Sequence, residues 1–165
     1  MTRARKITIG SAAALALLVA AGFAATAYLG RARPGHNVDR GGIALQGWDP
    51  VSYFPEGGAE PRQGDAGITA EHEGRRYRFV STANRDRFVA DPGRYEPQYG
   101  GWCAYAVANG YKFEVDPQSY LVEDGRLLLF YRGMLGDARE EFQNEGVAQG
   151  VAKADANWPA LANEE

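Results

Sequence analysis

The chain has 165 residues, of which 18 are Lys or Arg and 21 are Asp or Glu, so its formal net charge is −3 at pH 7. Residues 1–33 hold five basic and no acidic residues, which leaves 13 Lys and Arg against 21 Asp and Glu, a net charge of −8, in the remainder. The length fits one domain of ordinary size beside a targeting segment. The acidic balance argues against nucleic acid as a partner, because phosphate contacts require a basic surface, and leaves neutral or cationic partners.

The N-terminal segment is long and apolar. Residues 7–29 carry no charge and follow three basic residues, and they reach the roughly 20 residues that a membrane-spanning helix needs. We therefore expect a signal-anchor or signal peptide over residues 1–31, with contact to the membrane through residues 7–29. The favoured form is an uncleaved anchor that places the domain on the periplasmic or exterior side. Cleavage near Ala27, after a small-x-small sequence, would instead give a secreted protein.

The next segments predict a linker and short local elements. Residues 32–42 contain Pro and several Gly and indicate a linker. Residues 43–45 predict a short strand. Asp49-Pro50 predicts a helix start, because Asp is a good N-cap and Pro suits the first helical position. Residues 55–67 are rich in Gly and Pro and predict a loop.

A hairpin and a helix are expected next. Segments 68–71 and 77–80 flank a Glu-Gly turn at 73–74, and the second segment alternates apolar with basic residues as a half-buried strand does. Ser81 follows and can cap a helix that runs to about Ala90.

The second half of the domain shows the same mixture. In chain order we expect a helix, a turn or short helix, a hairpin and a C-terminal helical region, over residues 102–108, 116–117, 120–131 and 135–159. Asn109-Gly110 ends the helix, and Glu-Asp-Gly is the hairpin turn. The predicted fold class is α+β, with small antiparallel hairpins packed against short helices after an N-terminal hydrophobic helix.

Three segments resemble the bacterial YHS-domain proteins. They are LQGWDPVSYF (45–54), EGRRYRFVSTANRDRFVADPGRYEPQYGGWCAYAV (73–107) and ADANWPAL (154–161). The chain is most similar to the branch with an N-terminal hydrophobic segment and a Gly-Gly-aromatic-Cys-Ala motif. The resemblance implies a treble-clef-like YHS domain over residues 43–161, followed by a tail at 162–165, and it associates the chain with heavy-metal handling.

The chain departs from the metal-binding YHS pattern at each thiol. Ser52 stands where that pattern has a cysteine after Asp-Pro-Val, and Val80 and Asn84 stand at the two later cysteine positions. Zinc and copper sites depend on thiolate or imidazole ligands. The resemblance therefore carries over the fold but not this metal site.

Cys103 is the only cysteine, so the chain cannot form an intramolecular disulfide. One interpretation is a reactive thiol near a helix N-terminus, where the helix dipole lowers the pKa. The other is a small buried side chain of the core, because free cysteine is among the most buried residue types. No His, Asp or second Cys lies nearby in the sequence to assist a nucleophile.

Other candidates for a site are aromatic, glycine and histidine residues. Gly100 and Gly101 separate Tyr99 from Trp102, and glycines allow a ligand to approach the backbone closely. The ligand-binding candidates are Tyr99, Gly100, Gly101, Trp102 and Cys103. For a metal ion, which is a possible cofactor, the candidates are His72 and Cys103, although His72 also fits a surface position beside a hairpin turn.

Three Asp-Pro pairs are interpreted as structural. Asp49, Asp91 and Asp116 each precede a proline at a predicted boundary, and Asp-Pro commonly begins a helix or a turn.

These features favour a non-enzymatic, extracytoplasmic YHS-like binding module for a small ligand, a metal cation or an envelope protein. Two alternatives stay open. The first is a thiol-redox protein or sensor that uses Cys103 as its reactive group. The second is a structural subunit of an envelope complex.

Overall fold

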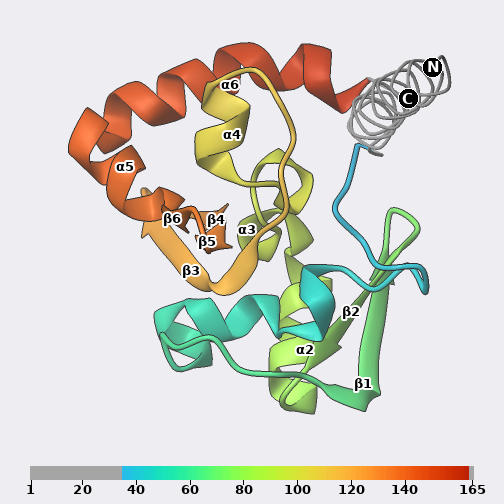
Figure 1. Cartoon of the computed structure of the whole chain (residues 1–165). Coiled ribbons are helices and arrows are strands. Elements are labelled where there is room, and N and C mark those ends of the chain that lie inside the picture. The colour runs from blue at the N-terminus through green and yellow to red at the C-terminus, as the bar shows by residue number, and fades with distance from the viewer. Residues whose placement is uncertain (1–34, 164–165) are drawn as a thin grey trace, which may run out of the picture. The chain divides into compact units, whose positions relative to one another are not determined.

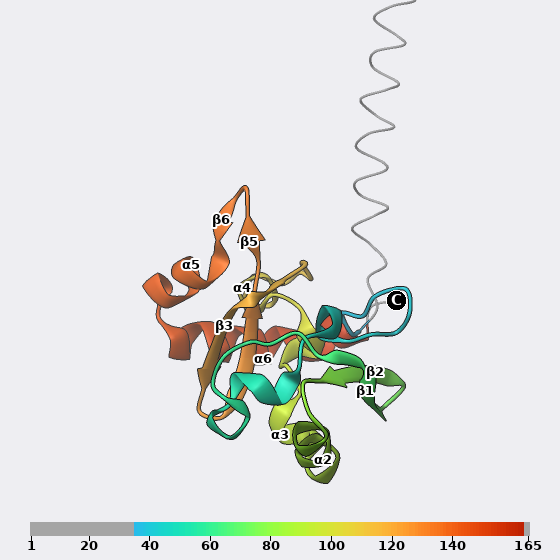
Figure 2. The same cartoon turned by 90° about the horizontal axis from the view of Figure 1, so that it is seen from below.

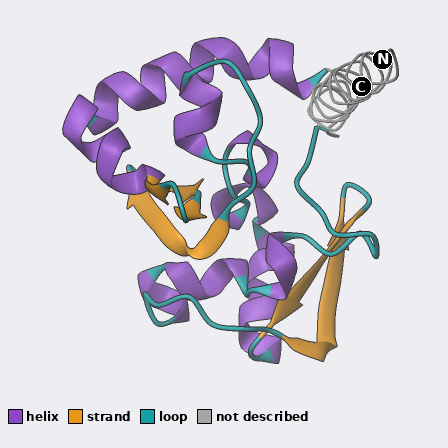
Figure 3. Cartoon of the chain, viewed as in Figure 1, coloured by secondary structure: helices purple, strands orange, loops and turns teal. Residues whose placement is uncertain are grey.

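The computed structural model describes residues 35–163 (Figure 1). The predictions for the anchor at 7–29 and for cleavage near Ala27 lie outside these residues. No helix in the described part is both long and apolar enough to cross a membrane. Within this part, three two-stranded antiparallel sheets and five α-helices confirm the predicted α+β class (Figure 3).

The described residues form short strands and helices that are joined by short connections. The sheets pair β1 with β2, β3 with β4 and β5 with β6; these strands are Asp65–His72, Arg75–Phe79, Asp116–Glu123, Arg126–Phe130, Arg132–Gly133 and Gly136–Asp137. The α-helices α2 to α6 are Thr82–Ala90, Pro92–Tyr95, Ala104–Ala108, Ala138–Glu145 and Val147–Ala162. Four 3₁₀-helices, η1 to η4, are Leu45–Gly47, Pro50–Tyr53, Pro55–Gly57 and Tyr99–Gly101.

Both predicted hairpin turns are confirmed. Glu73 and Gly74 have φ values of 47° and 75°, and Asp124 and Gly125 have φ values of 49° and 76°. Two consecutive residues with positive φ match the tight turn whose twist suits antiparallel strands. Each turn therefore fixes the register of its own hairpin, β1–β2 and β3–β4.

The predicted helix start at Asp49 is confirmed, as η2. One Asp49 oxygen accepts a hydrogen bond from the Val51 amide at 2.8 Å, and the other accepts from the Val80 amide at 2.9 Å and the Asn84 Nδ2 at 2.7 Å. Asp49 is fully buried. This carboxylate therefore joins η2 to the end of β2 and to α2. Ser81 caps α2 as predicted, because its Oγ accepts from the Asn84 amide at 3.1 Å.

Two predictions for short segments are wrong. Ile43 and Ala44 form only isolated bridges, one of them between Ile43 and Arg76. Leu45 already begins η1, because positive φ values at Leu45 and Gln46 turn the chain out of the extended conformation. Residues 116–117 form the start of β3 rather than a turn or short helix. Pro117 is tolerated there because the pairing with β4 shifts between residues 116 and 120, and proline is accommodated where ladder pairing is interrupted.

The bounds of two predicted helical segments, residues 102–108 and 135–159, are corrected. Helix α4 begins at Ala104 rather than at residue 102, since Trp102 is extended with ψ near 161°. The helical region after residue 135 is divided into α5 and α6 at Gly146, whose φ is 100°. Pro159 lies inside α6, because the core contacts of Trp158 and Leu161 hold the helix through this position.

The core of the second half is built on β4. All four residues from Leu127 to Phe130 are buried, and the Phe142 ring of α5 lies 5.1 Å from the Phe130 ring. Helix α4 packs between β4 and α6. The short β5–β6 hairpin projects beside α5 (Figure 2) and leaves Met134 and Leu135 exposed near its tip.

Candidate functional site

Cys103 is the N-cap residue of α4 and is buried, with 1% of its surface exposed. Its amide donates to the Phe113 carbonyl oxygen at 3.1 Å, and its Sγ accepts from the Tyr131 amide at 3.3 Å. Burial raises the pKa of the thiol and outweighs the backbone hydrogen bonds that lower it. The surroundings thus favour a protonated thiol that connects two separate chain segments.

We expect iodoacetamide to alkylate Cys103 in the native protein far more slowly than an ordinary thiol between pH 5 and 8. The raised pKa reduces the thiolate fraction, and only 1% of the residue's surface is exposed to a reagent. Alkylation in urea should return to the ordinary rate, which provides the control. Rapid native alkylation that levels off below pH 7 would contradict this result and support the thiol-redox alternative.

The backbone of residues 35–37 packs against Gly100 and Gly101. Gly100 has a φ of 59°, and a Cβ at this position would overlap the carbonyl oxygen of Gly35. The Asn37 amide donates to the Gly100 oxygen at 2.7 Å, and Asn37 Nδ2 donates to the Gly101 oxygen at 3.2 Å. The close approach predicted from the glycine pair is therefore made by residues 35–37, the described start of the predicted linker.

Tyr99 and Trp102 are core residues, at 4% and 3% exposed. The Tyr99 hydroxyl donates to Asp155 Oδ1 at 2.9 Å and accepts from Arg126 Nη2 at 3.2 Å. Its pKa is raised, first by burial and then by the hydrogen bond to Asp155. The structure places neither residue, nor the two glycines between them, in the walls of the two pockets described next.

A pocket of about 260 Å³ opens beside Cys103. Its walls come from α4, from the chain after α4, from the residue that follows β4 and from the segment 135–141, which includes β6 and the start of α5. The residues that line it are Cys103, Tyr105, Ala106, Tyr111, Phe113, Tyr131, Leu135, Gly136, Asp137, Ala138, Glu140 and Glu141. Four aromatic side chains and a thiol thus meet at one concave surface.

Cys103 holds two of these walls in place. Its amide and its sulfur bind the backbones of Phe113 and Tyr131, whose rings pack edge to face with centroids 5.1 Å apart. The sequence placed Cys103 in a candidate site but did not indicate Tyr111, Phe113 or Tyr131. The aromatic residues around the turn at Asn109-Gly110 could have indicated a site in the sequence. Their approach to Tyr131 depends on tertiary structure.

A second pocket, of about 280 Å³, lies between the β3–β4 turn and α6. It is lined by Glu123, Asp124, Arg126, Leu128, Ala148, Val151, Ala152 and Asp155. Arg126 Nη2 lies 2.6 Å from Asp155 Oδ1, so the one basic lining residue is already paired, while Glu123 and Asp124 add further negative charge. This pocket has no aromatic wall and is the weaker candidate for a ligand site.

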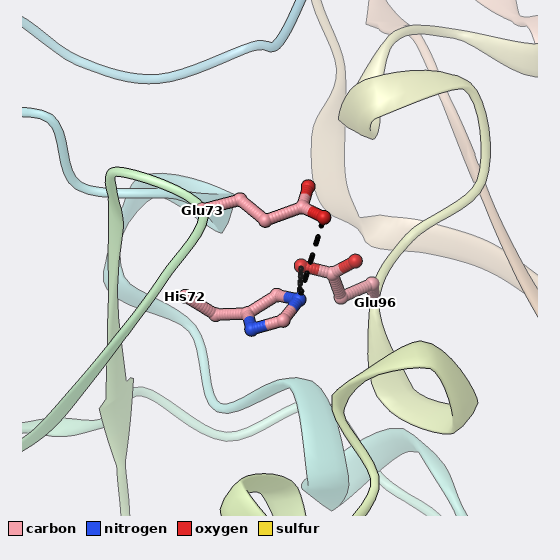
Figure 4. A group of neighbouring side chains, drawn as sticks. All are labelled: His72, Glu73 and Glu96. Atoms are coloured by element: carbon pink, nitrogen blue, oxygen red, sulfur yellow. Dashed lines mark ion pairs between the residues drawn. The ribbon is translucent and has the colours of Figure 1, made fainter.

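His72 lies in a separate polar cluster with Glu73 and Glu96 (Figure 4). Its Nε2 is 3.9 Å from one oxygen of each carboxylate. Arg75 Nη2 lies 2.6 Å from Glu73 Oε2 and 3.1 Å from Glu96 Oε1, and the Tyr77 hydroxyl donates to Glu96 Oε1 at 2.8 Å.

The guanidinium of Arg75 therefore already supplies the positive charge that a metal ion would bring to this cluster. Arg75 is 7% exposed. Its ion pairs link the β1–β2 turn to the chain after α3. Among residues 35–163 this is the one group of three potential ligands with their atoms close together, and Cys103 is not part of it. The two predicted metal candidates thus lie in different environments, and a metal ion stays a prediction.

Comparisons of the chain with protein-family models, with curated proteins and with solved structures give no match. The resemblance to YHS domains rests on the three segments 45–54, 73–107 and 154–161.

Proposed function

We propose that the chain is a non-enzymatic, YHS-like module that binds a small ligand in the aromatic pocket beside Cys103. The observation that carries the proposal is the convergence of Tyr105, Tyr111, Phe113 and Tyr131 on one concave surface. Ligand pockets are concave and mostly apolar, with a few polar groups, and those for drug-sized molecules measure roughly 300–1,000 Å³. A volume of about 260 Å³ suits a smaller molecule.

The chemistry of the lining supports binding rather than catalysis. Covalent catalysis needs a nucleophile beside a general base, or one with a lowered pKa. The pKa of Cys103 is raised, and no histidine is among the lining residues. Asp137 accepts the Ser119 hydroxyl at 2.6 Å and the Arg139 amide at 3.0 Å, so its Oδ1 caps α5.

The proposal includes attachment outside the cytoplasm. The apolar run at residues 7–29 supports an anchor in the cytoplasmic membrane. A module held in this way would meet its ligand in the periplasm or at the cell exterior.

The proposal predicts that benzyl alcohol, a small neutral aromatic probe, binds in this pocket. Titration of the full-length chain, followed by NMR, should shift signals of the pocket residues first. Tyr111→Ala should weaken binding about 3- to 10-fold, because it removes one aromatic wall. Tyr111 is 49% exposed, so this change should leave the fold intact.

Val89→Ala provides the matched control. Val89 is an exposed apolar residue of α2 and does not line the pocket. Its variant should bind benzyl alcohol as the unchanged chain does. Equal weakening by both substitutions, or no shift of pocket signals up to the solubility limit of the probe, would contradict the proposed function.

A further inference from the structure

We propose that the ligand of the Cys103 pocket is a small organic cation with an apolar body, such as a protonated amine. This inference rests on the proposed function, because it assigns a chemical class to the ligand of the same pocket. It follows from the charges around the pocket, from its aromatic walls and from the spacing of its carboxylates.

The charged residues that line the pocket are all acidic. Asp137, Glu140 and Glu141 contribute carboxylates, and no Lys or Arg is among the lining residues. Asp137 has a partial counter-charge, because Arg139 Nη2 lies 3.5 Å from its Oδ2. Within residues 35–163, Glu140 and Glu141 have no ion-pair partner.

The N-terminus of α5 does not neutralise this charge. Glu140 and Glu141 lie in the first turn of α5, where acidic residues also stabilise the helix through its dipole. The dipole corresponds to roughly half a positive charge, whereas the two glutamates contribute two full negative charges. The field of Glu141 reaches the wall of the pocket: its charge adds to the hydrogen bond that the Tyr105 hydroxyl donates to Glu145, and to burial, in raising the pKa of Tyr105.

The aromatic walls favour the same kind of ligand. A cation is attracted to the face of an aromatic ring, and four rings line this pocket. An aromatic wall alone would also accept a neutral apolar molecule. The acidic lining residues add a preference for the cation over a neutral molecule of the same shape and disfavour an anion.

The spacing of the acidic groups argues for an organic rather than an inorganic cation. Calcium and similar ions need several oxygen ligands at about 2.3–2.6 Å. Among residues 35–163, the group of three potential metal ligands that comes close together is His72, Glu73 and Glu96. The pocket carboxylates do not form such a group, whereas an ammonium with an apolar body can contact the rings and one carboxylate at once.

Calorimetric titration of the full-length chain with benzylamine, benzyl alcohol and benzoate tests the inference, because these probes share a ring and differ in charge at neutral pH. We expect benzylamine to bind about 10-fold more tightly than benzyl alcohol, and benzoate to bind most weakly. The preference for benzylamine should decrease as the salt concentration is raised from about 0.02 to 0.5 M, because salt screens the attraction between exposed charges.

Glu140→Gln/Glu141→Gln should reduce the preference for benzylamine over benzyl alcohol to about 3-fold or less. Glu60→Gln/Glu123→Gln removes the same charge from two exposed residues that do not line the pocket, and it should keep the preference. Equal affinity for benzylamine and benzyl alcohol in the unchanged chain would overturn the inference and leave the proposed function standing. Absence of binding by all three probes would overturn both.

Discussion

Replacing Asp49 by alanine should lower the free energy of unfolding by about 4 kcal/mol. The Asp49 carboxylate is fully buried and accepts hydrogen bonds from the Val51 amide, the Val80 amide and Asn84 Nδ2. The substitution leaves all three donors without this acceptor, and an unsatisfied buried polar group costs about 1–3 kcal/mol. The loss should be large because these bonds join η2, the end of β2 and α2.

Urea denaturation of the full-length chain measures this effect, with Asp91→Ala as the matched control. Asp91 also precedes a proline and is the N-cap of α3, but it is exposed and its side chain makes no capping hydrogen bond. Its substitution should therefore change stability by about 0.5 kcal/mol or less. Similar losses for the two variants would show that the buried network does not carry the stability assigned to it.

The Gly100→Ala substitution should destabilise the fold by about 3 kcal/mol. Its φ of 59° costs a residue with a Cβ about 1–2 kcal/mol. The added Cβ would also overlap the Gly35 oxygen and lie 3.2 Å from the His36 Cα. Backbone atoms cannot move aside as a flexible side chain can, so the segment 35–37 should separate from η4 and lose the Asn37–Gly100 hydrogen bond.

Gly74→Ala separates the steric effect from the backbone strain. Gly74 has a φ of 75°, and no atom outside its immediate chain neighbours lies within 4 Å of a Cβ at this position. Its variant should lose only about 1–2 kcal/mol. Denaturation curves should therefore show a larger loss for Gly100→Ala, and amide exchange should increase at Asn37 in that variant alone. Equal losses would contradict the contact between residues 35–37 and η4.

The local elements of this fold were predictable where a residue type determines the backbone. Glu-Gly and Asp-Gly identified both hairpin turns, and Asp49 and Ser81 identified two helix starts. Bounds were less predictable where tertiary contacts decide them. Pro159 continues α6 because the neighbouring apolar residues pack on the core, which composition alone does not show.

The candidate site was predictable only through Cys103. The sequence left open whether the thiol is reactive or buried, and the structure places it in the core with a raised pKa. The pocket also needs Phe113, Tyr131 and the start of α5, which lie 10 to 38 residues away along the chain. No local pattern brings these segments together, since their approach depends on β4, α4 and α5 packing as one core.

The hydrogen bonds of Cys103 give it a structural role in the proposed site. It binds the backbones that present Phe113 and Tyr131, so the thiol can shape the pocket without reacting. The Gly100-Gly101 pair upstream is joined to residues 35–37 by a hydrogen bond from Asn37. Residues 100–103 thus have a structural role beside the pocket that we propose as a binding site.

The most direct test of this account is a set of intermolecular nuclear Overhauser effects between benzylamine and the full-length chain. The account predicts contacts from the probe to the rings of Tyr111, Phe113 and Tyr131, at the pocket beside Cys103. Contacts confined to Leu128 and Val151, in the pocket beside α6, would contradict it.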